Sequence, residues 1–303
     1  MMRGAPGARA FDAAAGLFRA LPHFRGKWQL ADLLRRLLLP IRGAADARCT
    51  VRMKDGSVMT WDVRDAAEGR AIWLGIWDDV IRDAVLRLLP PDAVILDVGA
   101  SVGAWTVPLA RRLAADGRVI AFEPVPANRT RLEHAVRANA LGNVTVSALA
   151  LGDAARDVGM WLRSSLTGAE SGTAAIVESG NAHLTVEMRP MDAWADEAAL
   201  SRLDFIKLDV EGAELMVLAG AERTVGRLRP LILAEFDEYW MSTHGQTAAD
   251  AAGWVRAHDY RMMRWNRSAK RFEPADAPEG DATLLVPAER AEGSKARDDG
   301  LVP

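Results

Sequence analysis

Three groups of residues in this sequence have the types and the spacing for chemistry, and the first surrounds a glycine turn. The segment 97–103 reads D-V-G-A-S-V-G and directly follows the apolar run 94–96. A β-branched apolar run followed by two glycines predicts a buried parallel strand, a tight turn and then a helix. Ligands of open parallel sheets bind beyond the carboxyl ends of the strands. The candidate cofactor-binding residues are therefore Asp97, Gly99, Ala100, Ser101 and Gly103.

The second group is Glu123 and Pro124, which end the next predicted strand, Arg118 to Phe122. An acidic residue at this place typically hydrogen-bonds the hydroxyls of a ribose. The glycine spacing is not the G-x-G-x-x-G of nicotinamide and flavin sites, and a carboxylate beside the turn suits an amine-bearing ligand better than a pyrophosphate. S-adenosylmethionine is the cofactor that fits both groups.

The third group gathers charge at the ends of two later strands. Lys207, Asp209 and Glu211 alternate along and beyond the predicted strand Phe205 to Asp209, while Glu235 and Asp237 end the strand Leu231 to Phe236. Residues two apart on a strand share a face, and charged groups in a buried strand must be paired or functional. We therefore expect an active edge on the same side of the sheet as the glycine turn.

Two mechanisms suit this edge if a methyl group passes from a sulfonium to a hydroxyl. In the first, a general base removes the proton of the acceptor; the candidates are Asp209, Glu235, Glu211 and His244, with Asp209 and Glu235 foremost. In the second, Asp209, Glu235 and Asp237 hold Mg²⁺, which lowers the pKa of the acceptor. A structural alternative is a salt network in which Lys207 neutralises Asp209 or Glu235.

Three blocks of the sequence together resemble the FkbM family of class I S-adenosylmethionine-dependent methyltransferases. They are DVGASVGAWT, VIAFEPVPANRTRLEHAVRANAL and DFIKLDVEGAELMVLAGAERTVGRLRPLILAEF. The resemblance covers about residues 70–240, and the K-x-D-x-E-G-A-E block from Lys207 to Glu214 is its most distinctive motif. It implies a Rossmann-like α/β fold: a seven-stranded class I methyltransferase sheet with helices on both faces. It also implies O-methylation of a hydroxyl on a sugar, glycan or glycosylated secondary metabolite.

The resemblance implies two further contacts with the cofactor. One is an acidic residue in the helix before the glycine turn, for which Asp78 and Asp79 are the candidates; the alternative is a solvated helix face. The other is Asp153, or a neighbouring backbone group, at the amino nitrogen of the adenine. A structural turn is the alternative for Asp153.

Periodicity predicts the elements that position these groups. Two helices between Phe11 and Leu39 and a hairpin turning at Asp55-Gly56 come first, followed by a helix from Trp73 to Leu89. Residues 158–189 alternate in polarity and predict a β insertion that covers a substrate. A closing pair of strands follows at Tyr260 to Trp265 and Ala282 to Val286. The predicted domains are an N-terminal appendage (1–68), a catalytic domain (69–287) and a disordered tail (288–303).

Composition limits the partners. The net charge of −3 over 303 residues gives no electrostatic case for nucleic acid, and no apolar run is long enough to span a membrane. The single cysteine, Cys49, and the absence of a signal-peptide pattern predict a cytoplasmic protein.

The basic N-terminal helices are open to two interpretations, packing on the catalytic domain or peripheral contact with a membrane or an acidic glycan. Two other functions also stay open: a non-catalytic module that binds the cofactor and a glycan, and a Rossmann oxidoreductase, which the missing G-x-G-x-x-G disfavours.

Overall fold

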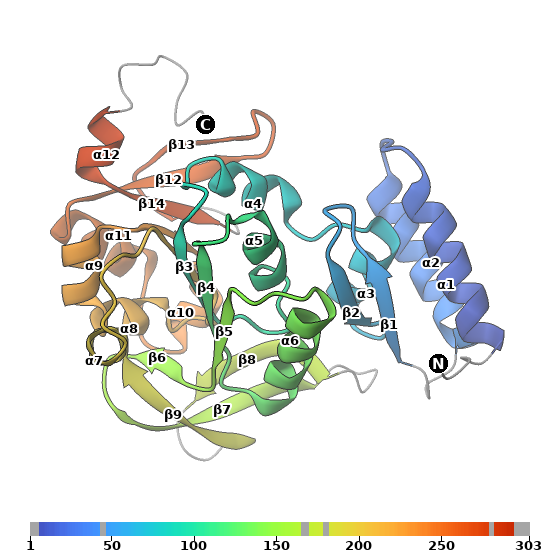
Figure 1. Cartoon of the computed structure of the whole chain (residues 1–303), viewed down its shortest axis with the longest axis horizontal. Helices are drawn as coiled ribbons and strands as arrows, with labels where there is room; N and C mark the ends of the chain where they lie inside the picture. Colours follow the sequence, from blue (N-terminus) through green and yellow to red (C-terminus); the bar gives the residue numbers. More distant parts are fainter. Residues whose placement is uncertain (1–5, 43–46, 165–169, 178–181, 279–281, 294–303) are drawn as a thin grey trace.

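Short apolar runs form a central sheet of eight strands (Figure 1). The computed structural model describes residues 6–42, 47–164, 170–177, 182–278 and 282–293. The order across the sheet is β13-β12-β14-β11-β10-β3-β4-β5. The strands are β3 (Val94–Val98), β4 (Arg118–Phe122), β5 (Val144–Ser147), β10 (Phe205–Leu208), β11 (Leu231–Ala234), β12 (Tyr260–Asn266), β13 (Arg271–Ala275) and β14 (Thr283–Pro287). Five neighbouring strands of this sheet are parallel: β5, β4, β3, β10 and β11. The other three, β14, β12 and β13, pair antiparallel.

This arrangement confirms the predicted α/β fold class and adds one strand to the seven that were expected. The eighth strand, β13, pairs with β12 at the edge of the sheet. The side chain of Asn266 accepts hydrogen bonds from the backbone of Ser268 and Ala269, and Lys270 has a φ of 53°. The chain therefore reverses tightly, and Arg271 begins β13.

Helices cover both faces of the sheet, because successive side chains of the parallel strands point to opposite sides. Leu96, Ile206 and Leu208 share one core with the helices α7 (Met191–Glu197), α8 (Glu214–Ala219), α9 (Glu222–Leu228), α10 (Glu238–Ser242) and α11 (Ala248–Ala257). Ile95 and Phe205 belong to the opposite core, with α4 (Asp79–Leu86) and α5 (Thr106–Arg112). The helix α6 (Pro126–Ala138) packs against Ala100 and Ala121.

The helix predicted from Trp73 to Leu89 is in fact two helices, α3 (Ala66–Leu74) and α4. Gly75 ends α3 with a φ of 70°, and its N–H donates to the carbonyl of Ala71. Asp78, with a φ of 45°, then precedes α4. The break follows from the left-handed conformation that glycine adopts at a helix end, and it moves Asp78 from a helix face to a helix start.

The N-terminal part packs onto the rest of the chain. It comprises α1 (Pro6–Ala20), α2 (Lys27–Arg42) and the predicted hairpin of β1 (Arg48–Arg52) and β2 (Val58–Asp62). Phe11, Phe18, Trp61 and Trp73 are buried in a core that also contains Val102, Val107 and Ala135. The domain limits stay a prediction, and the boundary at residue 68 falls inside α3.

The predicted β insertion is a separate sheet of four strands, drawn in green to yellow below the central sheet in Figure 1. Its strands are β6 (Ala150–Gly152), β7 (Arg156–Ser164), β8 (Glu170–Val177) and β9 (Leu184–Pro190), in the order β6-β9-β7-β8. Residues 165–169 and 178–181 lie outside the described residues.

The last described element is a short helix, α12 (Ala288–Gly293), where a disordered tail was expected. Glu289 of α12 makes hydrogen bonds of 2.9 Å with the guanidinium of Arg229, which fixes this segment to α9. Residues 294–303 lie outside the described part. Within the described ranges, every helix is too short or too polar to span a lipid bilayer.

Candidate active site

The turn after β3 is built for close approach of the backbone. The N–H groups of Gly99 and Ala100 both donate to the carbonyl of Phe122, at 3.0 Å. Gly99 has a φ of 81°, and a Cβ at this position would lie 1.9 Å from the carbonyl oxygen of Asp209. Gly103 has a φ of 90°, and its Cβ would lie 2.7 Å from Leu132. The two glycines therefore let the turn lie directly against the chain after β10 and against α6.

Asp97 is a buried carboxylate with one unpartnered oxygen. It lies on β3 with no exposed surface, and its Oδ2 accepts a hydrogen bond of 2.5 Å from the Thr106 hydroxyl. Its Oδ1 is buried and has no hydrogen-bond partner among the described residues. Burial raises the pKa of Asp97, which the cation of Lys207 partly offsets. A buried acceptor without a donor is costly, so Asp97 is set to receive an external cation or donor.

Glu123 braces the glycine turn from β4. Its two carboxylate oxygens accept hydrogen bonds from the backbone N–H groups of Ser101 (2.7 Å) and Val125 (2.8 Å). The side chain is buried, and burial raises its pKa to about 7. Each oxygen keeps a lone pair, so Glu123 can still accept from a ligand hydroxyl.

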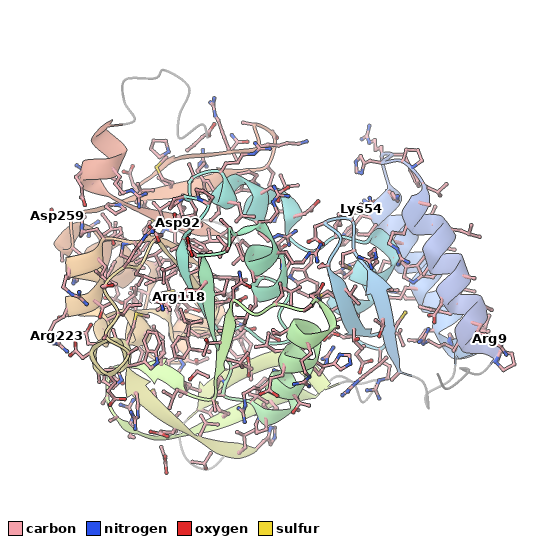
Figure 2. The ribbon with its side chains drawn as sticks, viewed as in Figure 1. Arg9, Lys54, Asp92, Arg118, Arg223 and Asp259 are labelled. Carbon is pink, nitrogen blue, oxygen red and sulfur yellow. The ribbon has the colours of Figure 1, made fainter. Side chains whose placement is uncertain are left out.

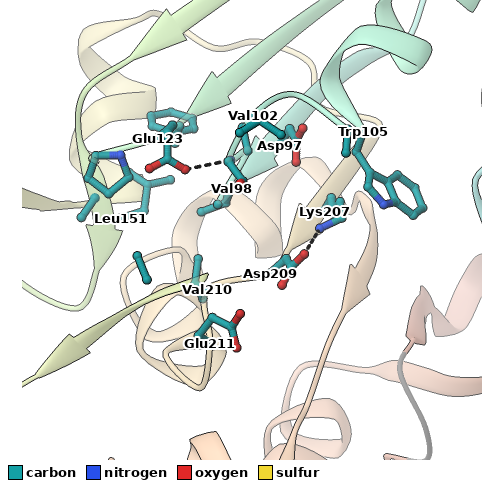
Figure 3. A pocket seen from close by; sticks show the side chains of 18 of the residues that line it. Asp97, Val98, Val102, Trp105, Glu123, Leu151, Lys207, Asp209, Val210 and Glu211 are labelled. Atoms are coloured by element: carbon teal, nitrogen blue, oxygen red, sulfur yellow. Dashed lines mark hydrogen bonds and ion pairs between the residues drawn. The ribbon is translucent and has the colours of Figure 1, made fainter. Parts of the chain in front are cut away.

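These groups line one cavity of about 250 Å³ (Figure 3). In Figure 3, Glu123 and Leu151 lie on one side and Trp105 and Lys207 on the other. The lining includes Pro124 and apolar side chains from β4, the β5–β6 region and the insertion: Phe122, Leu149, Leu151, Met160 and Ile176. The insertion thus borders the same cavity as the glycine turn.

Lys207 and Asp209 form an ion pair at the end of β10. The distance from Lys207 Nζ to Asp209 Oδ2 is 2.6 Å, and the ammonium also lies 5.4 Å from the centre of the Trp105 ring. Burial alone would lower the pKa of Lys207, but the carboxylates of Asp209, Asp97 and Glu235 raise it above its ordinary value. Lys207 is therefore a fixed cation, and the salt network expected from the sequence is present in part.

A second cavity, of about 600 Å³, adjoins the first. Its lining includes Asp78, Asp79 and Glu235. Three residues line both cavities: Trp105, Lys207 and Asp209. The carboxylate of Asp78 accepts from the Trp105 indole at 3.4 Å, and burial raises its pKa. Asp78 thus lines the second cavity and not the first.

Glu211 lines only the first cavity, where it follows Asp209 in the loop after β10. Its φ is 52°, and the next residue, Gly212, has a φ of 93°. A Cβ on Gly212 would lie 2.4 Å from the carbonyl oxygen of Trp240. The loop is consequently held in place by close packing against α10.

Three predicted site residues lie elsewhere. Asp153 is exposed and pairs with Arg156 at 2.7 Å, and it lines neither cavity. Asp237 starts α10 and accepts from the N–H of Trp240. His244 is partly buried after α10, its Nε2 is buried and has no partner within the described residues, and burial lowers its pKa. It too lines neither cavity.

The metal hypothesis does not fit these positions. Across residues 6–293, leaving out the undescribed segments, no three His, Cys, Asp or Glu side chains are placed to hold a metal ion. Asp237 is engaged as a helix cap and Asp209 as the partner of Lys207. The expected Mg²⁺ set of Asp209, Glu235 and Asp237 is therefore not assembled, and we derive no step through a metal.

Sequence reasoning missed several residues of the site. Asp65, Glu68 and Trp77 from the α3 region line the first cavity, and Trp105 divides the two cavities. Asp65 was detectable as a helix cap, because its side chain accepts from the N–H groups of Ala67 and Glu68 in a D-x-x-E pattern. That signal predicts a helix start and says nothing of a distant cavity.

A family model for the methyltransferase FkbM domain matches residues 97–262, more than half of the chain and all of the strands from β4 to β11. The chain belongs to the FkbM methyltransferase family. The predicted family is thereby confirmed. Methyl transfer dependent on S-adenosylmethionine is accordingly the activity of this FkbM domain.

Two curated relatives match parts of the chain. The AMB antimetabolite synthetase AmbE of Pseudomonas aeruginosa is 31% identical in an alignment 217 residues long that covers 60% of this chain and 10% of that protein. The 2-O-methyltransferase NoeI of Sinorhizobium fredii is 40% identical over 55 residues, which are 18% of this chain and 22% of that protein. The matches thus span about a tenth and about a fifth of these relatives.

Solved structures resemble the chain at low identity. A methyltransferase FkbM from Methylobacillus flagellatus is 18% identical, with a TM-score of 0.45, over 93% of this chain and 58% of that one. An O-methyltransferase from Bacillus cereus in complex with SAH is 12% identical, with a TM-score of 0.41, over 92% of this chain and 98% of that one.

The first cavity of this FkbM domain fits the chemical groups of S-adenosylmethionine. The unpartnered Oδ1 of Asp97 suits its amine, and the buried carboxylate of Glu123 suits its ribose hydroxyls. The apolar lining from Phe122 to Ile176 suits a flat purine.

Proposed function

We propose that the protein transfers a methyl group from S-adenosylmethionine to a hydroxyl oxygen of a sugar, a glycan or a glycosylated secondary metabolite. The observation that carries the proposal is the position of Asp209, whose side chain lines both the cofactor cavity and the second cavity. The second cavity would then hold the acceptor. The short match to a 2-O-methyltransferase agrees with oxygen as the acceptor atom.

Two carboxylates of the first cavity, Asp97 and Glu123, hold the cofactor in this proposal. The bound cofactor supplies an electrophilic methyl carbon on a sulfonium. Asp97 accepts from its amine, and Glu123 accepts from its ribose while holding the turn through Ser101. Such positioning aligns the acceptor oxygen with the methyl carbon, which is worth about 7 to 11 kcal/mol of the barrier in favourable cases.

Asp209 is the general base of the proposed reaction. As the new C–O bond forms and the C–S bond breaks, the acceptor hydroxyl loses its proton to the carboxylate of Asp209. Lys207 holds Oδ2 of this carboxylate at 2.6 Å, which leaves Oδ1 for the proton. The three other candidate bases lie less favourably: Glu235 lines only the second cavity, Glu211 only the first and His244 neither.

The cofactor site is tested by calorimetry with S-adenosylmethionine and S-adenosylhomocysteine. Glu123→Ala should weaken binding about ten- to a hundredfold, because a hydrogen bond to a buried charged group is worth about 1.5 to 3 kcal/mol. Glu133→Ala, on the exposed face of α6, is the matched control and should bind like the wild type. A wild-type protein that binds neither compound would contradict the proposal.

The base is tested by single-turnover methylation of a panel of sugars and glycosides, with the methylated atom identified by mass spectrometry. Asp209→Asn should bind S-adenosylhomocysteine normally but react about a hundred- to ten-thousandfold more slowly. Glu235→Gln should have the smaller effect. Methyl groups found on nitrogen, or an unimpaired Asp209→Asn, would refute the assignment, and cofactor binding without any transfer would favour a non-catalytic binding module.

A further inference from the structure

The two N-terminal helices leave an apolar face uncovered in the described part of the chain. Ten large hydrophobic side chains are exposed in the whole described part of the chain, and eight of these ten lie from Leu17 to Ile41. On α2 four of the five exposed members, all except Trp28, are spaced three and four residues apart, which places these four on one side of the helix. They are Leu30, Leu33, Leu37 and Ile41.

The opposite sides of the same helices are already packed. Phe11, Phe18 and Ala31 are buried, and both α1 and α2 contact α3. Figure 1 shows the pair as the right-hand end of the molecule, with its outer side turned away from the catalytic sheet. Leu17 is 75% exposed and Leu37 is 61% exposed, so the outer face is available to a partner.

This helical hairpin, residues 6–42, is also strongly basic. It contains seven arginines and lysines but only two aspartates, a net charge of +5, whereas the whole chain carries −3. Arg9, Arg25 and Arg36 are exposed. Figure 2 shows Arg9 at the outer edge of the hairpin, on the right. The apolar face is therefore bordered by positive charge.

We propose that the helical hairpin α1–α2 docks on an anionic lipid surface. Apolar side chains on one helix face with arginines beside them can insert at the boundary between headgroups and acyl chains. Anionic lipids also attract each cation near the surface. A second copy of the chain is the less suitable occupant, because two hairpins that each carry a net charge of +5 would repel each other.

The docking surface adjoins the proposed acceptor cavity. Trp28 and Val80 are exposed and also line the second cavity, and the guanidinium of Arg70 lies 4.8 Å from the centre of the Trp28 ring. A docked hairpin would turn the mouth of that cavity toward the membrane. The acceptor would then be a hydroxyl compound held at the membrane surface, an extension that rests on the proposed function.

Vesicle flotation of the full chain tests the docking. The protein should bind vesicles of phosphatidylcholine with phosphatidylglycerol, bind pure phosphatidylcholine weakly, and lose binding at high salt. The triple variant R9Q/R25Q/R36Q should bind the anionic vesicles on the order of a hundredfold less tightly, from about 1 kcal/mol for each arginine. The pair L33S/L37S should lose at least about tenfold.

The controls separate docking from unfolding and from dimerisation. R112Q/R118Q/R256Q removes three exposed arginines outside the hairpin and should bind normally; Arg118 lies toward the centre in Figure 2. All variants should keep the wild-type circular dichroism spectrum and melting temperature. No binding to anionic vesicles, or an unaffected L33S/L37S, would overturn the proposal. So would a dimer that L33S/L37S dissociates without vesicle binding. Because flotation needs neither turnover nor an acceptor, such a failure leaves the methyltransferase proposal intact.

Discussion

At the scale of single residues, Glu214 is a charged residue in an unusual environment. It ends the K-x-D-x-E-G-A-E motif, and its side chain has no exposed surface. Its Oε1 accepts from the N–H groups of Val210 (3.1 Å) and Gly212 (3.4 Å), and its Oε2 is buried without a partner among the described residues. Glu214 therefore holds the loop that presents Asp209.

This environment predicts a pH-dependent stability. Burial raises the pKa of Glu214 from 4.5 to about 7, so between these values the folded protein keeps a proton that the unfolded chain has released. The stabilisation is complete below about pH 4.5 and is lost as the pH rises to about 7, and it amounts to at most about 3 kcal/mol. Glu214→Gln should flatten this part of the curve, measured by urea unfolding from pH 4.5 to 8.

The matched control is Glu133→Gln, on the surface of α6, which should keep the wild-type pH dependence. Glu123 contributes in the same direction, because burial also raises its pKa to about 7. A Glu214→Gln variant with an unchanged slope would show that the protonation of Glu214 does not differ between the folded and unfolded states.

At the scale of elements, the turn after β3 packs directly against the loop after β10. Gly99→Ala should destabilise the protein by about 3 kcal/mol or more, because the new Cβ meets the Asp209 carbonyl and the residue has a positive φ. Gly142→Ala, where no atom lies within 4 Å of the added Cβ, should change the stability by less than about 1 kcal/mol. Thermal unfolding checks both, and equal effects would mean that the turn can move away from β10.

At the scale of the whole molecule, a buried ion pair joins the N-terminal part to the catalytic sheet. Glu68 of α3 and Arg131 of α6 make a two-pronged contact, with Arg131 Nη1 at 3.0 Å from Glu68 Oε1. The backbone of Asp62 also donates to Glu68, at 2.6 Å, and the Arg131 guanidinium donates to the carbonyl of Thr60. The pair therefore ties α3, β2 and α6 together beside the first cavity.

Removing one partner of this ion pair should lower the free energy of unfolding more than replacing both partners. Glu68→Leu leaves the Arg131 guanidinium buried without its counter-charge and should destabilise by about 3 to 5 kcal/mol. Adding Arg131→Met should recover part of the loss. Urea unfolding of the two single variants and the double variant measures the coupling, and strictly additive losses would mean that the two side chains stabilise the fold independently.

Local spacing alone determined the main strands of the fold and the glycine turn. Alternating and continuous apolar runs give the strands, and the D-V-G-x-x-x-G segment gives the turn with positive φ at Gly99 and Gly103. The same local rules failed where a short-range alternative was equally good: Gly75 divides a predicted helix, and Asn266 starts a hairpin that adds β13. At both places neighbouring residues favour different local structures, and the sequence pattern decides between these structures only in part.

The tertiary structure decided which charged groups share a cavity. Asp209 and Glu235 lie 26 positions apart in the chain but line one cavity, whereas Asp153 and His244, which were also candidate site residues, line neither. Burial of Asp97 and Glu214, and the entry of Glu68 into the site from the N-terminal part, depend on contacts across the whole fold. Spacing along the chain determines which face of a strand a side chain occupies and how a turn is shaped. Burial and proximity arise only when distant elements pack together, and burial and proximity determine the pKa and the partners of each charged group.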